Sequence, residues 1–182
     1  MKAVRWLILL WPGIISAQWS FDFEENFPNR WEQFPESRWE ISSESPLNGL
    51  FSLHHSYDNP SSGEDMAYVN LNYPVLDSAL IFSFRIKHAY NPSSGNNWQV
   101  YFLSQQGNQL INAFVFGVNF KGSDDMIKLW QVVEGETSEI VNTEIDYEEY
   151  IGRSNAPQFV IRREPSGLWK VSGDIEGQGG AL

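Results

Sequence analysis

Apolar and polar side chains alternate along much of this chain. In residues 81–87 the alternation places Phe82, Phe84 and Ile86 on one face and polar side chains on the other. A period of two residues is typical of a half-buried β-strand, and no window keeps the period of 3.6 residues that would indicate an amphipathic helix. The strands that we predict are residues 19–23, 38–42, 50–55, 67–71, 81–87, 97–102, 113–120, 126–133, 158–162 and 168–172.

Turn-forming sequences separate these segments. Asn59–Gly63 and Asn91–Gly95 both read Asn-Pro-Ser-Ser-Gly. Pro fixes φ and Gly adopts positive φ, so both sequences suit loops between antiparallel strands. Many short strands with regularly spaced turns predict an all-β fold, an antiparallel sandwich or barrel. No linker rich in Pro, Gly or Ser divides the chain, and we expect a single domain.

The N-terminus has the pattern of a secretory signal peptide. Lys2 and Arg5 form a short basic region, residues 6–15 form an apolar run, and small residues follow. The run is too short for a membrane-spanning helix, which needs ~20 apolar residues. We therefore expect residues 1–17 to be removed and residues 18–182 to form the domain. The protein would be secreted or held at the cell surface, with no membrane span.

The charge of the chain excludes one class of partner. Its 23 acidic and 12 basic residues give a formal charge of −11, and loss of Lys2 and Arg5 with the signal peptide lowers it to −13. Such a surface repels phosphate backbones, and no cluster of Lys or Arg offsets the repulsion, so we expect no nucleic-acid binding. The chain has no cysteine, so an exported fold depends on its core without disulfides.

One acidic segment suggests catalysis. Residues 143–149 read Thr-Glu-Ile-Asp-Tyr-Glu-Glu, which resembles the catalytic strand of a family of β-sandwich glycoside hydrolases. In a strand, Glu144, Asp146 and Glu148 share a face and could line one groove. A retaining glycosidase needs two carboxyl groups ~5–5.5 Å apart. Glu144 and Glu148 lie ~13 Å apart along a straight strand, so their side chains would have to lean together around a substrate.

The flanking sequence favours a different interpretation. The alternation stops at Tyr147, and residues 147–152 read as an acidic turn. We therefore expect Glu144, Asp146 and Glu148 to be solvated loop carboxylates and the protein not to be an enzyme. Glycoside hydrolysis through these three residues stays the third hypothesis for its function.

The chain gives little basis for a metal site. His54 and His55 are adjacent, so in a strand they face opposite sides and cannot bind one metal together, and no zinc-binding spacing is present. Carboxylates near two turns leave calcium possible. Because they lack the spacing of a calcium loop, we expect no cofactor. The residues that would be calcium ligands are Asp58, Glu64, Asp65, Asp124 and Asp125.

Aromatic residues are abundant, with eight Trp, seven Tyr and twelve Phe. Trp98 and Trp130 lie inside predicted strands, and we expect both in the core. Other aromatic residues lie at the predicted end of the sandwich or close before the two Asn-Pro-Ser-Ser-Gly loops. Exposed Trp and Tyr rings stack on sugars in carbohydrate-binding sandwiches. The ligand-binding candidates are Tyr57, Tyr90, Trp31 and Trp39.

Several segments together resemble a known module. Residues 19–31, with Trp-Ser-Phe-Asp-Phe-Glu and a later Trp, resemble its opening, and residues 82–104 resemble its Phe-x-Phe, Asn-Pro-Ser-Ser and Val-Tyr block. Residues 127–130 and 159–169 resemble two later strands. The order of these motifs is similar to the N-terminal β-sandwich of large secreted surface proteins of the Bacteroidetes, which often precedes lamin-tail and C-terminal sorting domains.

The resemblance implies a concanavalin A-like jelly roll, related in shape to laminin G and legume-lectin domains, and it brings no catalytic residues. It implies a secreted, non-catalytic module with a structural or adhesive role at the cell surface, with further domains of the same protein downstream. A carbohydrate-binding module is the alternative, so a glycan or another cell-surface polymer is the expected partner.

The resemblance also implies that the domain lacks its last strands. In that family at least two more strands follow the one at 168–172, whereas residues 177–182 have no strand character. We expect residues 18–182 alone to be prone to aggregation, with an unpaired sheet edge and an apolar groove beside Phe21 and Phe23.

Overall fold

The computed structural model describes residues 19–24, 30–61, 63–71, 79–106 and 110–174. The expected signal peptide, residues 1–17, lies outside the described residues. The elements in chain order are β1 (Trp31–Phe34), β2 (Trp39–Ser42), β3 (Ser52–His55), β4 (Met66–Val69), β5 (Leu80–Arg85), β6 (Gln99–Gln106), β7 (Leu110–Val118), β8 (Met126–Val133), β9 (Glu136–Asp146), the π-helical turn η1 (Tyr147–Ile151), β10 (Gln158–Arg163) and β11 (Trp169–Asp174).

The largest sheet is an antiparallel meander in the order β6-β7-β8-β9. Its four strands follow one another in the chain, and a tight turn connects the last two. Between β8 and β9, Glu134 and Gly135 both have positive φ, 51° and 84°, and Val133 pairs with Glu136. Two residues with positive φ match the right-handed twist of a hairpin, which explains the abrupt reversal at this point.

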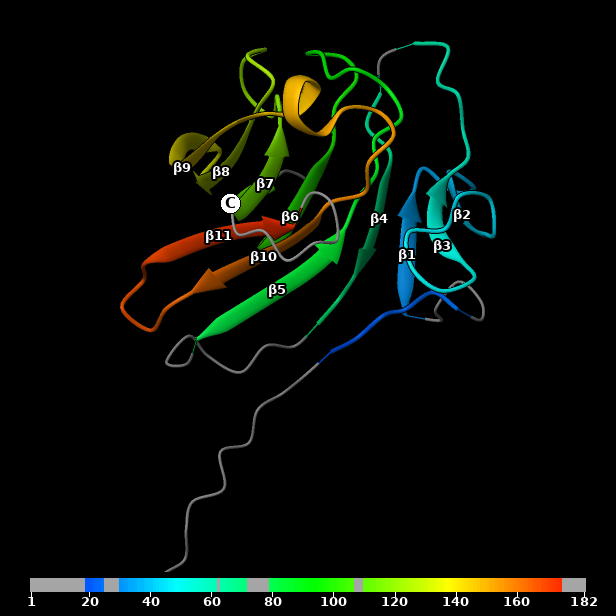
Figure 1. The fold of residues 1–182 in the computed structure, drawn as a ribbon. Coiled ribbons are helices and arrows are strands. Elements are labelled where there is room, and N and C mark those ends of the chain that lie inside the picture. The colour runs from blue at the N-terminus through cyan, green and yellow to red at the C-terminus, as the bar shows by residue number, and fades with distance from the viewer. Residues whose placement is uncertain (1–18, 25–29, 62, 72–78, 107–109, 175–182) are drawn as a thin grey trace, which may run out of the picture.

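A second, three-stranded sheet has the order β11-β10-β5, with β10 in the middle. The β10–β11 hairpin closes through the backbone of Glu164, whose N–H donates to the carbonyl of Leu168 at 2.8 Å. Strand β5 comes from much earlier in the chain and pairs antiparallel with β10. Figure 1 shows this sheet crossing one face of the meander, with β1, β2 and β3 to one side of both.

The core lies between the two sheets and is rich in aromatic rings. The ring of Phe159 on β10 lies 5.1 Å from that of Phe116 on β7, 5.9 Å from that of Phe84 on β5 and 6.1 Å from that of Trp98. All but Phe84 are buried, and Phe84 packs against them. Burial of apolar area, at roughly 25 cal/mol per Å², is the main stabilising term for such a sandwich.

The N-terminal part of the chain forms two smaller ladders, β1 with β4 and β2 with β3, both antiparallel. The side chain of Gln33 fixes the turn between β1 and β2. Its Oε1 accepts hydrogen bonds from the backbone N–H groups of Arg38 and Trp39, each at 2.9 Å, and its Nε2 donates to the carbonyl of Trp39 at 2.9 Å.

The predicted fold class is confirmed, because the chain folds into antiparallel sheets that pack as a sandwich. The segment 126–133 is predicted with the observed bounds, and most other predicted strands overlap an observed one. The finer assignment, a concanavalin A-like jelly roll, stays a prediction, as does the expected loss of the last strands.

Two local predictions are wrong. Residues 19–23 do not form a strand; instead Phe21 and Phe23 pack edge-on against Trp31, with ring centroids 5.4 and 5.3 Å apart, and Phe23 has a φ of 59°. Glu144 and Asp146, predicted in a loop, lie at the end of strand β9, whereas the acidic turn predicted at 147–152 coincides with η1. Sequence periodicity also misses β1 altogether.

Candidate functional site

The three carboxylates of the acidic segment lie in two different elements. Glu144 is exposed near the end of β9, at a φ of 59° that interrupts the extended backbone. Asp146 caps η1, accepting a hydrogen bond from the backbone N–H of Glu149 at 3.0 Å. Glu148 lies in η1 and accepts from the side chain of Asn91 at 2.5 Å. The alternation that would place all three on one face is therefore not maintained.

A buried tyrosine anchors this segment to the sandwich. Tyr147 is fully buried, and its hydroxyl accepts a hydrogen bond from the backbone N–H of His88 at 3.1 Å. Its ring lies 5.9 Å from that of Trp98, and its own N–H donates to the carbonyl of Asp125 at 2.8 Å. The turn η1 is thereby fixed over the end of the core, where it appears as the orange-yellow coil in Figure 1.

Two exposed tyrosines flank this anchor. Tyr90 is 62% exposed and Tyr150 is 57% exposed. The Asn91–Glu148 hydrogen bond joins the loop of Tyr90 to the turn of Tyr150 across 57 residues of sequence. We call Tyr90, Asn91, Glu148 and Tyr150 the tyrosine surface. Its two exposed rings belong to the two segments that this hydrogen bond joins.

His88 supports the loop that carries Tyr90. Its Nε2 lies 3.0 Å from Oδ1 of Asn96, and its ring lies 6.2 Å from that of Tyr90. Burial lowers the pKa of His88 below its ordinary value, although the hydrogen bond to Asn96 acts in the opposite direction. Burial therefore favours the neutral imidazole, which is held to the loop by the Asn96 hydrogen bond.

A second cluster of polar side chains surrounds Asp65, whose own side chain is only 7% exposed. Its carboxylate accepts from Asn59 at 2.6 Å, lies 2.8 Å from Nε2 of His55 and lies 3.6 Å from Nε of Arg38. The Arg38 guanidinium also stacks on Tyr57, 3.4 Å from the ring centroid. Burial raises the pKa of Asp65, but the hydrogen bonds from His55 and Asn59 and the charge of Arg38 outweigh it and hold the pKa below its ordinary value.

We expect Asp65→Asn to destabilise the protein by about 1–3 kcal/mol near neutral pH, because Arg38 and His55 lose a buried charged acceptor. Since the pKa of Asp65 is lowered on folding, its contribution is complete above the unfolded value of about 3.9 and is lost as the pH falls through the folded pKa. Urea unfolding of wild type and variant between pH 3 and pH 7 measures the difference in the free energy of unfolding at each pH.

Asp58→Asn is the control for this prediction, since Asp58 is exposed in the same segment. Its effect should stay within about 0.5 kcal/mol at every pH. A difference between wild type and Asp65→Asn that persists unchanged to pH 3 would contradict the assignment of a stabilising ionised carboxylate.

Of the remaining calcium candidates Asp58 is exposed, and the other three each contact a side chain. Glu64 lies 3.4 Å from the hydroxyl of Tyr101, Asp124 pairs with Lys128, and Asp125 accepts from Asn119. Within the described part of the chain, no three His, Asp or Glu side chains gather as a possible metal site. Calcium binding and the expected lack of a cofactor both stay predictions.

The aromatic candidates divide into packed and exposed residues. Trp98 and Trp130 are buried, as predicted. Trp31 is partly buried beneath Phe21 and Phe23, and Trp39 packs against His55 at 5.0 Å, so neither is a free platform. Tyr57 is 40% exposed but has Arg38 on its ring.

Sequence reasoning missed a groove of about 370 Å³ where the two sheets meet, toward the end away from η1. We call it the Trp169 groove; it is lined by Phe114, Gln131, Ile140, Val141, Arg163 and residues 167–169. A signal for it was present, because Arg163 continues the inward-facing series of Phe159 and Ile161 on β10. A charged residue at an inward position is the feature that points to a site.

Comparisons with family models, curated proteins and solved structures find no match to this chain. Among the described residues, no helix is long and apolar enough to cross a membrane.

Proposed function

We propose that this protein is a non-catalytic β-sandwich module of an exported surface protein, and that its tyrosine surface binds glycans. The basic and apolar pattern of residues 1–17 supports export. The single observation that carries the binding role is the Asn91–Glu148 hydrogen bond, which joins two segments that each bear an exposed tyrosine.

The chemistry of this surface suits a sugar. A pyranose ring offers an apolar face, which packs on an aromatic ring, and hydroxyl groups, which hydrogen-bond to amides and carboxylates. Tyr90 and Tyr150 supply rings, and Asn91 and Glu148 supply polar atoms. The buried Tyr147 beneath them holds the turn in place, which lowers the entropy lost on binding.

Hydrolysis is supported less well than binding. A glycosidase needs two carboxyl groups facing one bond at a defined separation. Asp146 is occupied as the cap of η1, Glu148 is bonded to Asn91, and Glu144 lies at a break in β9. We therefore propose a module that binds without cleaving.

Replacing both Tyr90 and Tyr150 with alanine should remove retention on the preferred polysaccharide. Truncating a Tyr at a binding hot spot costs about 2 kcal/mol, or roughly 30-fold in affinity. Affinity electrophoresis against a panel of cell-wall and capsular polysaccharides measures the retention of wild type and variant.

Ile81→Ala is the matched control for the tyrosine variant, because Ile81 is an equally exposed apolar residue on β5, away from the tyrosine surface. It should bind as the wild type does. Wild-type protein that no polysaccharide in the panel retains, or equal retention of the double variant, would contradict glycan binding.

A further inference from the structure

The Trp169 groove is lined by a basic side chain, Arg163, one nitrogen of which has no acceptor. Of the described basic residues, four are partly or fully buried: Arg38, Arg85, Lys128 and Arg163. Arg38 pairs with Asp65, Lys128 pairs with Asp124 and Glu139, and Arg85 donates to the carbonyl of Ala156 and to Gln158. Among the residues described, Nε of Arg38 and Nη1 of Arg163 are buried without a hydrogen-bond partner, but Arg38 has the Asp65 carboxylate 3.6 Å away.

The carboxylate nearest to Arg163 in the sequence, that of Glu164, pairs with other basic side chains. Glu164 lies 2.9 Å from Nε of Arg162 and 3.3 Å from Nζ of Lys170. Those two basic residues pair across β10 and β11 on the outward face, whereas Arg163 pairs with Trp169. A buried cationic nitrogen without an acceptor is costly, so a fold that keeps one is expected to satisfy it by binding a ligand.

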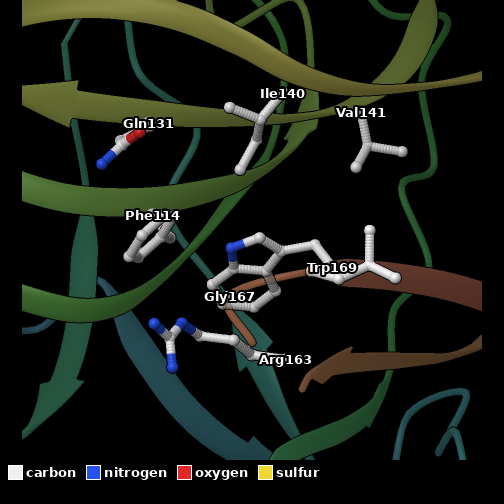
Figure 2. Close-up of a pocket in the computed structure, with 8 residues that line it drawn as sticks. Phe114, Gln131, Ile140, Val141, Arg163, Gly167 and Trp169 are labelled. Atoms are coloured by element: carbon white, nitrogen blue, oxygen red, sulfur yellow. The ribbon is translucent and has the colours of Figure 1, made fainter. Parts of the chain in front are cut away.

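The walls of the groove restrict what this can be. Figure 2 shows the Trp169 indole at the centre, with Ile140 and Val141 from β9 on one side and Arg163 on the other. The Trp169 ring packs on Phe114 at 4.7 Å between centroids. Besides Arg163, the lining side chains that can hydrogen-bond are Gln131, through its amide, and Trp169, through its indole N–H.

The open side of the groove is also apolar. Leu168 and Ile140 are exposed large apolar residues at its rim. Ile140 is placed there by a bulge in β9, since Leu129 pairs with Val141 and Trp130 with Glu139, which leaves Ile140 without a partner between them. A bulge commonly redirects a side chain beside a binding site.

We infer that the Trp169 groove binds a small organic carboxylate with an apolar body, its carboxylate on the Arg163 guanidinium and its body against Trp169, Leu168 and Ile140. A guanidinium binds a carboxylate through its N–H groups, and Nη1 of Arg163 has no other acceptor for its hydrogens. A sugar needs more polar partners than one amide and one indole N–H, and about 370 Å³ lies at the small end of ligand sites, ~300–1,000 Å³. This site is separate from the tyrosine surface and does not depend on glycan binding.

Isothermal titration calorimetry with 3-phenylpropanoate, octanoate and the neutral 3-phenylpropanamide tests the inference on the purified protein. We expect both carboxylates to bind and the amide to bind at least roughly tenfold more weakly, because it cannot form the charge-assisted pair. Arg163→Met, which keeps the length of the side chain, should bind carboxylate and amide equally weakly. Arg162→Met, on the outward face, is the matched control and should bind as the wild type does.

Thermal unfolding separates a binding role from a structural one. If Arg163 serves a ligand, Arg163→Met should unfold at a higher temperature than ligand-free wild type, since it removes an unsatisfied buried charge, and 3-phenylpropanoate should no longer raise that temperature. If Arg163→Met does not fold, Leu168→Ala supplies the second test, with weaker binding of both carboxylates expected.

Four results would overturn the inference. These are no binding of either carboxylate at millimolar concentration, equal binding of the amide, unchanged binding by Arg163→Met, or a concentration-dependent dimer that Arg163→Met abolishes in sedimentation velocity. The last would mean that a second copy of the chain occupies the groove. Replacing Tyr90 and Tyr150 with alanine should leave carboxylate binding unchanged, so failure here and failure of glycan binding are distinguishable.

Discussion

Replacing Phe159 with alanine is expected to lower the free energy of unfolding by about 3–5 kcal/mol. Phe159 is fully buried on the central strand β10 and contacts the rings of Phe84, Trp98 and Phe116. Its removal leaves a cavity that neighbours on two sheets cannot fill by local movement, because each of them is fixed by its own strand. A domain of this size has a total stability of about 5–15 kcal/mol, so the variant would be close to unfolding.

Urea unfolding followed by far-UV circular dichroism measures this loss. Ile81→Ala is the control, because Ile81 lies on β5 of the same sheet with its side chain 58% exposed. It should change the stability by no more than about 0.5 kcal/mol. A loss below 1 kcal/mol for Phe159→Ala would mean that the two sheets are not held together by this aromatic cluster.

The sequence predicts the central strands well because their alternation and their turns agree. Residues 126–133 carry inward-facing Ile127 and Leu129, and positive-φ turns follow at Glu134 and Gly135. Both signals are local, so a single sequence contains them. The same agreement explains why Trp98 and Trp130 are correctly predicted to be buried.

Strand β9 was missed for a physical reason. Its bulge at Ile140 shifts the parity of the apolar positions, so Val141 and Ile145 no longer continue the pattern of the first half. The positive φ of Glu144 breaks the extended backbone again before Asp146. Periodicity cannot detect a strand whose register changes twice in 11 residues.

The opposite error occurred at residues 19–23, where the alternation is present but no strand forms. A strand needs a neighbour for its backbone groups, and periodicity does not report one. Phe21 and Phe23 instead pack edge-on against Trp31. Apolar alternation there reflects ring packing, which a sequence pattern does not distinguish from a sheet.

The candidate sites were predictable only in part. The exposure of Tyr90 follows from its place before an Asn-Pro-Ser-Ser-Gly loop. Its connection to Tyr150 depends on the Asn91–Glu148 hydrogen bond, a contact between distant segments that leaves no local trace. The Trp169 groove likewise needs two sheets to meet, although the inward position of Arg163 was visible in the alternation of β10.

The second large effect is expected at a glycine. Gly117 lies inside β7, opposite Gln99 of β6. A Cβ added there would lie 3.0 Å from Cα of Gln99 and closer still to the backbone carbonyl oxygen of Trp98. A glycine inside a strand often marks such a close approach of another backbone segment. Because the obstructing atoms belong to the backbone, no side-chain rotation can relieve the clash.

We expect Gly117→Ala to cost at least about 3 kcal/mol, the upper end of the usual range for overpacking. Relief requires the start of β6 to move away from β7, which would also weaken the hydrogen bond from the N–H of Val118 to the carbonyl of Trp98, now 3.2 Å. That movement would displace the Trp98 indole from Phe116 and Phe159. The near-UV circular dichroism of the folded variant should therefore change as well as its urea midpoint.

Gly95→Ala is the matched control, because a Cβ at Gly95 meets no heavy atom within 4 Å. It should leave the midpoint within about 0.5 kcal/mol of the wild type and the near-UV spectrum unchanged. Equal midpoints for Gly117→Ala and Gly95→Ala would mean that β6 and β7 can separate locally without loss. The placement of Trp98 would then depend on the aromatic core alone, and not on the close contact of the two backbones.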